Sequence, residues 1–276
     1  MMFTAALIQT RTGTDPERNF AALARQIREA AAAGASLVAT PEGSNVLQRD
    51  RALLAAVLRE EGDDLFVSGL ARLARELSIT LVAGSLLVRA GDEAAGKAAN
   101  RCYVFAPDGS IAARYDKVHL FDVNLGPGGE HRESDSYVAG ARACCIATQA
   151  GMLGLTICYD VRFPHLYRDL ARAGAQIITT PAAFTRVTGE AHWDTLLRAR
   201  AIETGAFILA PAQGGLHEDG RATWGRTVAY GPWGERLGLL DHDEPGTLLV
   251  DIDLAAAQEA RRRIPALSHD RVYAAP

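Results

Sequence analysis

Short apolar runs alternate with amphipathic stretches along the whole chain. Continuous or alternating apolar positions are typical of strands, whereas an apolar stripe that repeats every third or fourth residue is typical of a helix. We expect strands over residues 3–9, 36–40, 79–88, 102–105, 111–115, 143–148, 152–159, 176–180, 206–210 and 247–252. We expect helices over residues 16–33, 65–77, 164–173, 191–204 and 254–263.

Residues that begin and end secondary structure flank several of these segments. Asp15 is a favourable N-cap for a helix that has Pro16 at its first position, and Gly34 ends that helix. Residues 107–109 (Pro-Asp-Gly) form a turn between two strands and predict a hairpin, and residues 231–234 predict a second one. Residues 91–99 have the composition of a loop, and residues 116–141 carry no periodicity.

The alternation of strands and helices predicts a layered α/β fold with a mixed sheet or two stacked sheets. No repeat, low-complexity tract or Ser/Pro-rich linker divides the 276 residues, so we expect one domain that spans residues 1–276. The composition, 48% hydrophobic and 22% charged, is that of a globular protein and excludes intrinsic disorder.

The net charge and the cysteine content indicate which binding partners and which cellular compartment to expect. The net charge of −4 and the pI near 6.0 provide no basic field that would attract nucleic acid or anionic lipid. Four cysteines are too few for a disulfide framework and fit a reducing compartment. The first residues lack the basic region of a signal peptide, and no apolar run is long enough to span a membrane. We therefore expect a cytoplasmic protein with neither nucleic-acid nor membrane partners.

Three reactive side chains lie at or just beyond the carboxyl ends of predicted strands, where open α/β proteins bind ligands. They are Glu42, Lys117 and Cys158. A thiol that attacks, a carboxylate that takes its proton and an ammonium group that stabilises negative charge would form a nucleophilic site. Taken singly, each has a simpler interpretation: a small buried side chain, a turn residue and a surface charge. Position alone therefore makes this site a hypothesis.

The sequence around Glu42, Lys117 and Cys158 supports the hypothesis of a nucleophilic site. The segments are Pro41-Glu42, Tyr115-Asp116-Lys117-Val118-His119-Leu120-Phe121-Asp122 and Cys158-Tyr159-Asp160-Val161-Arg162-Phe163-Pro164, followed by residues 174–175, 188–193, 197–204, 231–234 and 251–254. This ordered set covers nearly the whole chain. It resembles the nitrilase, or carbon–nitrogen hydrolase, superfamily, and within it the branch that holds deaminated-glutathione amidase and ω-amidase.

The resemblance implies an αββα sandwich that pairs with a second copy, so that sheets stack across a homodimer or a larger homo-oligomer. It also implies that Cys158 is the nucleophile, that Glu42 is the general base, and that Lys117 stabilises the tetrahedral intermediate on the way to a thioester. The family has a second glutamate in the loop after the lysine. Glu133 is the best match, and Glu130 is the rival.

Further roles concern the substrate. The backbone N–H of Tyr159 is the natural second donor to an oxyanion, and Arg162 could bind a substrate carboxylate. The arginines nearest the expected site are Arg162, Arg186, Arg198 and Arg200, and each could equally form a structural ion pair. His165 stands where this branch usually has Glu; because it begins a predicted helix, we expect it to affect local capping.

The resemblance to this branch implies hydrolysis of a small ω-amide that carries a carboxylate. Deaminated glutathione is favoured over α-ketoglutaramate, and residues 123–136, 185–190 and 213–222 would distinguish them at the mouth of the site. The histidines and cysteines lack zinc-ligand spacing, residues 126–129 do not form a dinucleotide fingerprint, and no serine-hydrolase elbow occurs, so we expect no cofactor. A catalytically silent binding or scaffold protein is the remaining alternative.

Overall fold

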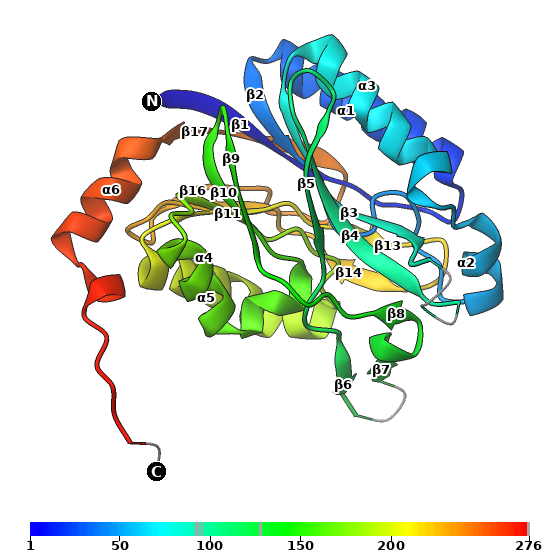
Figure 1. Ribbon diagram of the computed structural model, residues 1–276. Coiled ribbons are helices and arrows are strands. Elements are labelled where there is room, and N and C mark those ends of the chain that lie inside the picture. Colours follow the sequence, from blue (N-terminus) through cyan, green and yellow to red (C-terminus); the bar gives the residue numbers. More distant parts are fainter. Residues whose placement is uncertain (92–93, 95, 127–128, 275–276) are drawn as a thin grey trace.

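Two β-sheets stack face to face, and helices cover both outer surfaces (Figure 1). The computed structural model describes residues 1–91, 94, 96–126 and 129–274. Helices α1 (Pro16–Ala32) and α3 (Leu65–Leu77) lie on one side, and α4 (Pro164–Arg172) and α5 (Arg186–Thr204) lie on the other. The order of the layers is therefore helix, sheet, sheet, helix, and the predicted αββα sandwich is confirmed.

Both sheets mix parallel and antiparallel pairs. The first sheet runs in the order β17 (Gly246–Asp253), β1 (Met2–Gln9), β2 (Ala35–Ala39), β3 (Thr80–Arg89), β4 (Ala98–Phe105) and β5 (Ile111–Asp116), and β8 (Tyr137–Val138) pairs with β4. The second runs β16 (Arg236–Leu239), β15 (Val228–Tyr230), β12 (Phe207–Ala210), β11 (Ile177–Thr179), β10 (Gly151–Leu155) and β9 (Cys144–Thr148). In each sheet the parallel strands are central, β1–β2–β3 in the first and β10–β11–β12 in the second.

Smaller elements complete the chain. Two ribbons pair β6 (Asp122–Asn124) with β7 (Glu130–Arg132) and β13 (Gly214–Leu216) with β14 (Ala222–Trp224). The remaining helices are α2 (Arg51–Val57) and α6 (Leu254–Arg263), with 3₁₀ turns at Glu61–Asp63, Glu133–Asp135, Cys158–Arg162 and Ala266–Ser268. After α6 the C-terminal segment leaves the body of the molecule (Figure 1).

The apolar core has two main parts. One lies between the first sheet and its helices and includes Ile8, Leu70 and Phe105. The other fills the space between the sheets and under α4 and α5, and it includes Leu155 and Leu197. Burying each such side chain contributes about 1.5–3 kcal/mol. Because the second core reaches both sheets, it holds together the strand ends that carry the reactive side chains.

Local sequence signals explain where several helices begin and end. The Asp15 carboxylate accepts hydrogen bonds from the N–H groups of Glu17 and Arg18, with Pro16 at the first helical position. Gly34 follows the helix with a φ of +94°, a conformation that residues with a Cβ rarely adopt. The predicted bounds of α3 and α6 and the hairpin turn at 231–234 are confirmed.

The structure corrects several predicted bounds. The strand expected over 152–159 ends at Leu155, and Cys158 lies instead in a 3₁₀ turn. The helix expected from 191 begins at Arg186, because the Thr185 hydroxyl caps it by accepting from the N–H of Thr188. Within the loop expected over 91–99, Ala98 already belongs to β4, while residues 92, 93 and 95 lie outside the described residues.

The structure also contains elements that the periodicity did not indicate. These are α2, β13 and β14, together with β6, β7 and β8 inside the stretch 116–141. In the glycine-rich stretch 126–129, residues 127 and 128 lie outside the described residues.

Candidate active site

Three charged side chains meet at the end of the first sheet. The Lys117 Nζ lies 2.8 Å from Glu42 Oε1 and 2.9 Å from Glu133 Oε2. Glu42 follows β2 and Lys117 follows β5, whereas Glu133 begins a 3₁₀ turn beyond β7. The lysine side chain is only 2% exposed, so its charge is balanced by these two carboxylates and not by water.

Hydrogen bonds hold both oxygens of Glu42 in place. Oε1 accepts from Asn100 Nδ2 at 2.9 Å as well as from Lys117, and Oε2 accepts from the backbone N–H of Ala183 at 2.8 Å. The Gln213 Nε2 donates to the backbone carbonyl of Glu42 at 3.0 Å. Ala183 and Gln213 follow strands of the second sheet, so the carboxylate spans the two sheets.

The geometry distinguishes Glu133 from Glu130. Both oxygens of Glu133 contact Lys117, and one accepts from the backbone N–H of Phe121 at 2.6 Å. Glu130 is an exposed residue of β7. The structure therefore brings Glu133, and not Glu130, into the cluster.

Cys158 reaches the same place from the second sheet. It opens the 3₁₀ turn after β10 with a φ of +50°, and its N–H donates to the carbonyl of Pro181 at 2.8 Å. A non-glycine residue in this region stores about 1–2 kcal/mol, which the surrounding hydrogen bonds must offset. The side chain is buried, and its thiol is close enough to Glu42 and Lys117 for both charges to affect its pKa.

Burial and charge act together on the pKa values of this cluster. Burial raises the pKa of the Cys158 thiol, and the charge of Glu42 raises it further. The charge of Lys117 cancels only part of this increase, so the pKa of the thiol lies well above its usual value. For Glu42, burial favours the neutral acid, but the Lys117 charge and hydrogen bonds outweigh it and lower the pKa. For Lys117, burial is likewise outweighed by Glu133 and Glu42, which raise the pKa. The resting site thus holds a protonated thiol beside a carboxylate that can accept its proton.

Asn100 and Gln213 are residues that sequence reasoning missed. Asn100 Nδ2 also contacts Glu133 Oε1 at 3.3 Å, so one amide bridges both carboxylates. Both residues lie outside the predicted strands, because β4 begins at Ala98 and not at the predicted residue 102, so no sequence pattern indicated that these amides are buried and need partners.

Aromatic side chains and Arg162 contact one another in the segment that follows Cys158. The Tyr159 ring packs edge-on against Phe121, with centroids 5.1 Å apart. The Arg162 guanidinium lies 5.8 Å from the centroid of Tyr159 and 5.4 Å from that of Phe184, and it hydrogen-bonds His192 Nδ1 at 3.2 Å. Stacking of this kind leaves the in-plane N–H groups of a guanidinium able to bind a carboxylate.

The other arginines have structural contacts. Arg200 is buried, donates to the carbonyl of Val161 and pairs with Glu203, while Arg186 pairs with Asp243. Arg198 lies toward the turn at Gly234, between β15 and β16. Of the four arginines considered from the sequence, Arg162 follows Cys158 by four positions, and among the described residues its guanidinium contacts His192 and no carboxylate.

His165 lies in the first turn of α4, where we expected it to affect local capping. No side-chain hydrogen bond caps α4, and the His165 ring instead packs edge-on against His119 and Phe163, with centroids 5.7 and 6.1 Å away. The contacts of His165 at the start of α4 are therefore aromatic ones.

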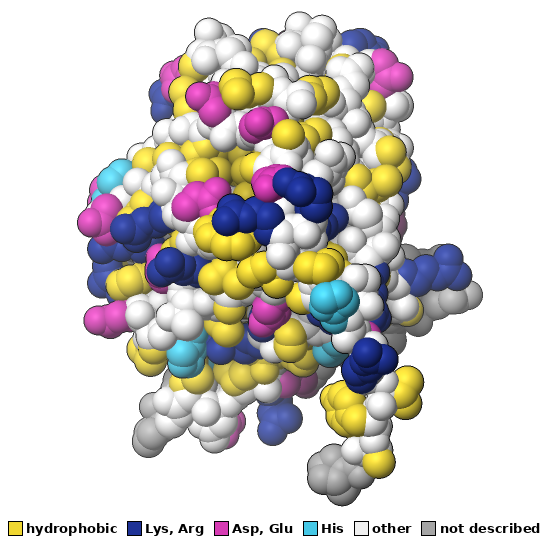
Figure 2. Space-filling model, turned by 90° about the vertical axis from the view of Figure 1, so that its left-hand side faces the viewer, with side chains coloured by type: hydrophobic (Ala, Val, Ile, Leu, Met, Phe, Trp, Pro, Cys, Tyr) yellow, Lys and Arg dark blue, Asp and Glu magenta, His cyan; other side chains and the backbone are white. Residues whose placement is uncertain are grey.

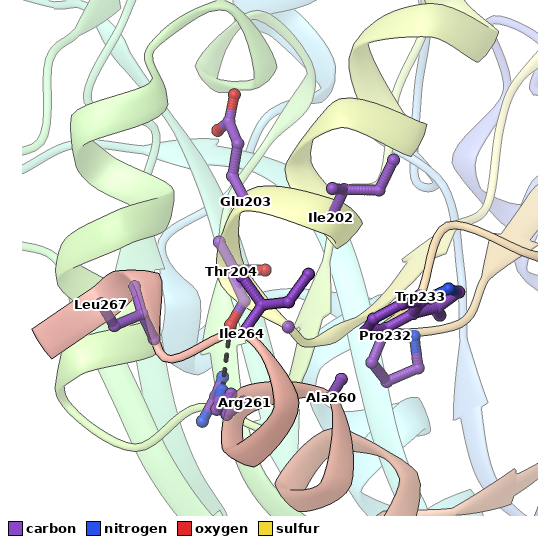
Figure 3. Close-up of a pocket in the computed structure, with 10 residues that line it drawn as sticks. Ile202, Glu203, Thr204, Pro232, Trp233, Ala260, Arg261, Ile264 and Leu267 are labelled. Carbon is purple, nitrogen blue, oxygen red and sulfur yellow. Dashed lines mark hydrogen bonds between the residues drawn. The ribbon is translucent and has the colours of Figure 1, made fainter. Parts of the chain in front are cut away.

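A cavity of about 210 Å³ lies elsewhere, between the end of α5, the turn at 231–234 and α6 (Figure 3). Ile202, Trp233 and Ile264 line it, and Arg261 closes one side by donating to the carbonyl of Thr204. Glu42, Lys117 and Cys158 do not line it. Among the residues that the structure describes, no group of three metal-ligating side chains occurs, and no helix is long and apolar enough to cross a membrane.

The fold and this cluster of a thiol, two carboxylates and an ammonium group define a hydrolase of carbon–nitrogen bonds. The carbon–nitrogen hydrolase family model matches residues 4–262, and the chain belongs to this family, within the nitrilase superfamily. The chain is 38% identical over 267 residues to a deaminated glutathione amidase of Yersinia enterocolitica, covering 96% of this chain and 92% of that protein.

Solved structures agree with this assignment. The NitFhit protein of C. elegans superposes with a TM-score of 0.89 at 33% identity; the match covers 98% of this chain and 65% of that protein. A mutant amidase from Nesterenkonia sp. AN1, which carries acrylamide added to its active-site cysteine, superposes with a TM-score of 0.78 at 29% identity, covering 95% and 98% of the two chains. The predicted family and the amide-hydrolysing activity are therefore confirmed.

Proposed function

We propose that this chain hydrolyses a small carboxylate-bearing ω-amide, with deaminated glutathione as the favoured substrate, through a thioester on Cys158. The observation that carries the proposal is the cluster in which Lys117 joins Glu42 and Glu133 beside a buried thiol. Such a cluster provides a nucleophile, a base and a fixed positive charge in one water-poor site.

Acylation follows from the protonation states in the resting site. The Cys158 sulfur attacks the amide carbon while its proton passes to Glu42, whose pKa is low enough to keep it ionised beforehand. Negative charge develops on the amide oxygen, where Lys117 and the backbone N–H of Tyr159 donate to it. Glu42 returns the proton to the nitrogen, the carbon–nitrogen bond breaks, and ammonia or an amine leaves.

Deacylation uses the same carboxylate in reverse. Glu42 takes a proton from water, the hydroxide adds to the thioester carbon, and the carbon–sulfur bond breaks to release the acid and regenerate the thiol. Glu133 keeps Lys117 charged through both steps, because it supplies a second negative charge 2.9 Å from Nζ. Asn100 holds the two carboxylates in one orientation.

Substrate recognition is assigned to Tyr159 and Arg162. Arg162 lies four positions beyond the nucleophile, stacked between two aromatic rings, and could bind the carboxylate of a substrate whose amide lies at Cys158. The name of the Yersinia enterocolitica relative supports deaminated glutathione as that substrate. ω-Amidase action on α-ketoglutaramate is the second candidate, because that compound shares the reacting end and differs only in the remote part.

Steady-state kinetics with both compounds and a panel of simple aliphatic amides test this proposal. A carboxylate held by one well-placed arginine raises kcat/KM by about 10- to 150-fold if the contact persists in the transition state. We expect deaminated glutathione to be turned over best, and Arg162→Leu to remove most of the preference over simple amides. Ten-fold better turnover of α-ketoglutaramate would reject the favoured substrate, whereas a preference for simple amides would reject the substrate class. No turnover of any amide would leave only the silent binding or scaffold alternative.

The proposed assembly is at least a homodimer. Ile202, Trp233 and Ile264 are 56%, 49% and 59% exposed around the cavity of Figure 3, an apolar surface suited to a subunit contact. Apolar side chains also gather across the face shown in Figure 2, from which the C-terminal segment projects. The resemblance further supports a role for α4, which begins six residues after Cys158, as a subunit contact that would tie the dimer to the site. Light scattering that finds a fully active 29.5 kDa monomer would contradict this proposal.

The proposed location is the cytoplasm, and the proposed unit is one carbon–nitrogen hydrolase domain over residues 1–276. All four cysteines are free thiols, which supports a reducing compartment. The site joins segments of both sheets, from Glu42 to Gln213, which supports a single domain. Fractionation of the native host tests the location, and recovery of the protein in an oxidising compartment would contradict it.

A further inference from the structure

Asp160 is fully buried and its carboxylate accepts four hydrogen bonds. Oδ2 accepts from the Tyr115 hydroxyl at 2.7 Å and from the N–H of Ile157 at 2.8 Å. Oδ1 accepts from the N–H of His119 at 3.1 Å and from its Nδ1 at 2.7 Å. The side chain is 0% exposed, so these donors replace all of its hydration.

The four donors belong to the two chain segments that carry the reactive groups. Tyr115 and His119 flank Lys117, two positions on either side, at the end of β5 in the first sheet. Ile157 directly precedes Cys158, beyond β10 in the second sheet. One carboxylate thus connects the segment of the ammonium group to the segment of the thiol.

We propose that Asp160 is a positioning residue that sets the distance between the Cys158 thiol and the Lys117 ammonium group by tying their two segments together. The inference rests on the proposed roles of Cys158 and Lys117. Its physical basis is that Cys158 adopts a left-handed φ in a short turn, and the hydrogen bond from Ile157 to Asp160 closes that turn. Misplacement of a reacting group by about 1 Å can cost 100-fold in rate.

His119 is one of the residues that hold the Asp160 carboxylate by hydrogen bonds. Its ring stacks on Phe163 with centroids 3.5 Å apart and an interplanar angle of 7°, which fixes the orientation of Nδ1 toward Asp160. Oδ1 of Asp160 also accepts from the backbone N–H of His119, and in the tautomer whose Nδ1 carries the proton the ring donates a second hydrogen bond to the same oxygen. An Asp160–His119 pair that acts as a second general base is the competing interpretation, and the experiment below separates the two.

The central variant is Asp160→Asn, which replaces one acceptor oxygen by an amide that cannot accept from Tyr115 or Ile157. We expect kcat to fall about 100-fold with KM changed less than about three-fold, because the substrate contacts are untouched. Addition of acrylamide to Cys158 should slow to a similar degree, and this measurement needs no knowledge of the natural substrate. Tyr115→Phe removes a single donor and should lower kcat about ten-fold, which keeps a test available if Asp160→Asn does not fold.

Two controls separate positioning from stability and from base catalysis. Asp64 is a buried carboxylate that caps α3 on the outer layer, so Asp64→Ala, which removes the capping oxygen, should lower the melting temperature without lowering kcat. At His119, the Asn side chain can place its amide N–H near the position of Nδ1, whereas Gln extends toward Nε2. We therefore expect His119→Asn to retain several-fold more kcat than His119→Gln.

The outcomes decide between the interpretations. Equal loss in both His119 variants, together with loss of a pH-dependent step near neutrality, would replace positioning by base catalysis. Normal kcat and normal acrylamide reactivity in a folded Asp160→Asn or Tyr115→Phe variant would overturn the inference. If Cys158→Ala were fully active, the proposed roles themselves would fail, and this result is independent of the Asp160 variants.

Discussion

Replacing Lys117 by Met tests the charge balance of the site. Methionine has nearly the same length and no charge, so the substitution removes one buried ammonium group and leaves the carboxylates of Glu42 and Glu133. These side chains are 9% and 13% exposed, and both lie within 3 Å of Nζ in the native protein. The two carboxylates would then face each other without a cation.

The structure allows the cost to be estimated. The contacts of 2.8 and 2.9 Å to a common Nζ place the two oxygens at most about 6 Å apart, and at an effective dielectric constant near 20 their repulsion is about 3 kcal/mol. Breaking a buried pair by removing one partner typically costs about 3–5 kcal/mol. At about 2 °C per kcal/mol for a chain of this size, we expect Tm to fall by about 6–10 °C.

The loss of stability in the Lys117→Met variant should depend on pH. In the native protein the pKa of Glu42 is lowered, so its contribution is present above its usual value of 4.5 and is lost only as pH falls through the lower folded value. The pKa of Lys117 is raised, so its contribution is present below 10.5 and is lost only as pH rises through the folded value. Between these limits the contribution of Glu42 and Lys117 to the native stability is nearly independent of pH.

In the Lys117→Met variant, the carboxylates lower the stability as pH rises instead of contributing to it. Two buried carboxylates without a cation share a proton, so the folded state binds more protons than the unfolded state above pH 4.5. Stability then falls by about 1.4 kcal/mol for each pH unit over which one extra proton is held. The deficit relative to the native protein should grow by about 2–3 kcal/mol between pH 5.5 and 7.5.

Urea unfolding of both proteins at these two pH values measures the effect, with Lys97→Met as the matched control. Lys97 is exposed and donates to the carbonyl of Ser134, so its replacement should change stability by less than about 0.5 kcal/mol. A Lys117→Met deficit that is the same at both pH values, or that stays within the range of the control, would refute this account of the site.

Further predictions concern the reaction itself. Cys158→Ala should abolish amide hydrolysis and leave the fold intact, because a methyl group cannot form a thioester; near-normal turnover would exclude Cys158 as the nucleophile. Cys145→Ala, at the edge strand β9, should cost packing energy and leave kcat unchanged. Activity should persist in a strong chelator, and a loss that only added metal restores would contradict a cofactor-free reaction. Since the pKa of Glu42 is lowered, the acid limb of kcat/KM should lie below pH 4.5.

Local signals in the sequence were sufficient for much of the framework. The helix Leu65–Leu77 follows from its apolar stripe, the first helix begins where Asp15 caps it, and the turn at 231–234 follows from its Gly and Pro residues. The placement of Glu42 and Lys117 after apolar strands followed in the same way. These features depend on residues a few positions apart, so a linear pattern carries them.

Contacts between residues that are far apart in the sequence determined the remaining features of the site. The preference for Glu133 over Glu130 depends on which loop residue reaches Lys117, and the roles of Asn100 and Gln213 depend on neighbours far away in the chain. The 3₁₀ turn at Cys158 replaced a predicted strand because Asp160, held by the segment around Lys117, closes it. A linear pattern records which side chains are polar, but burial between two sheets determines which partner each must find, and only the tertiary structure shows that pairing.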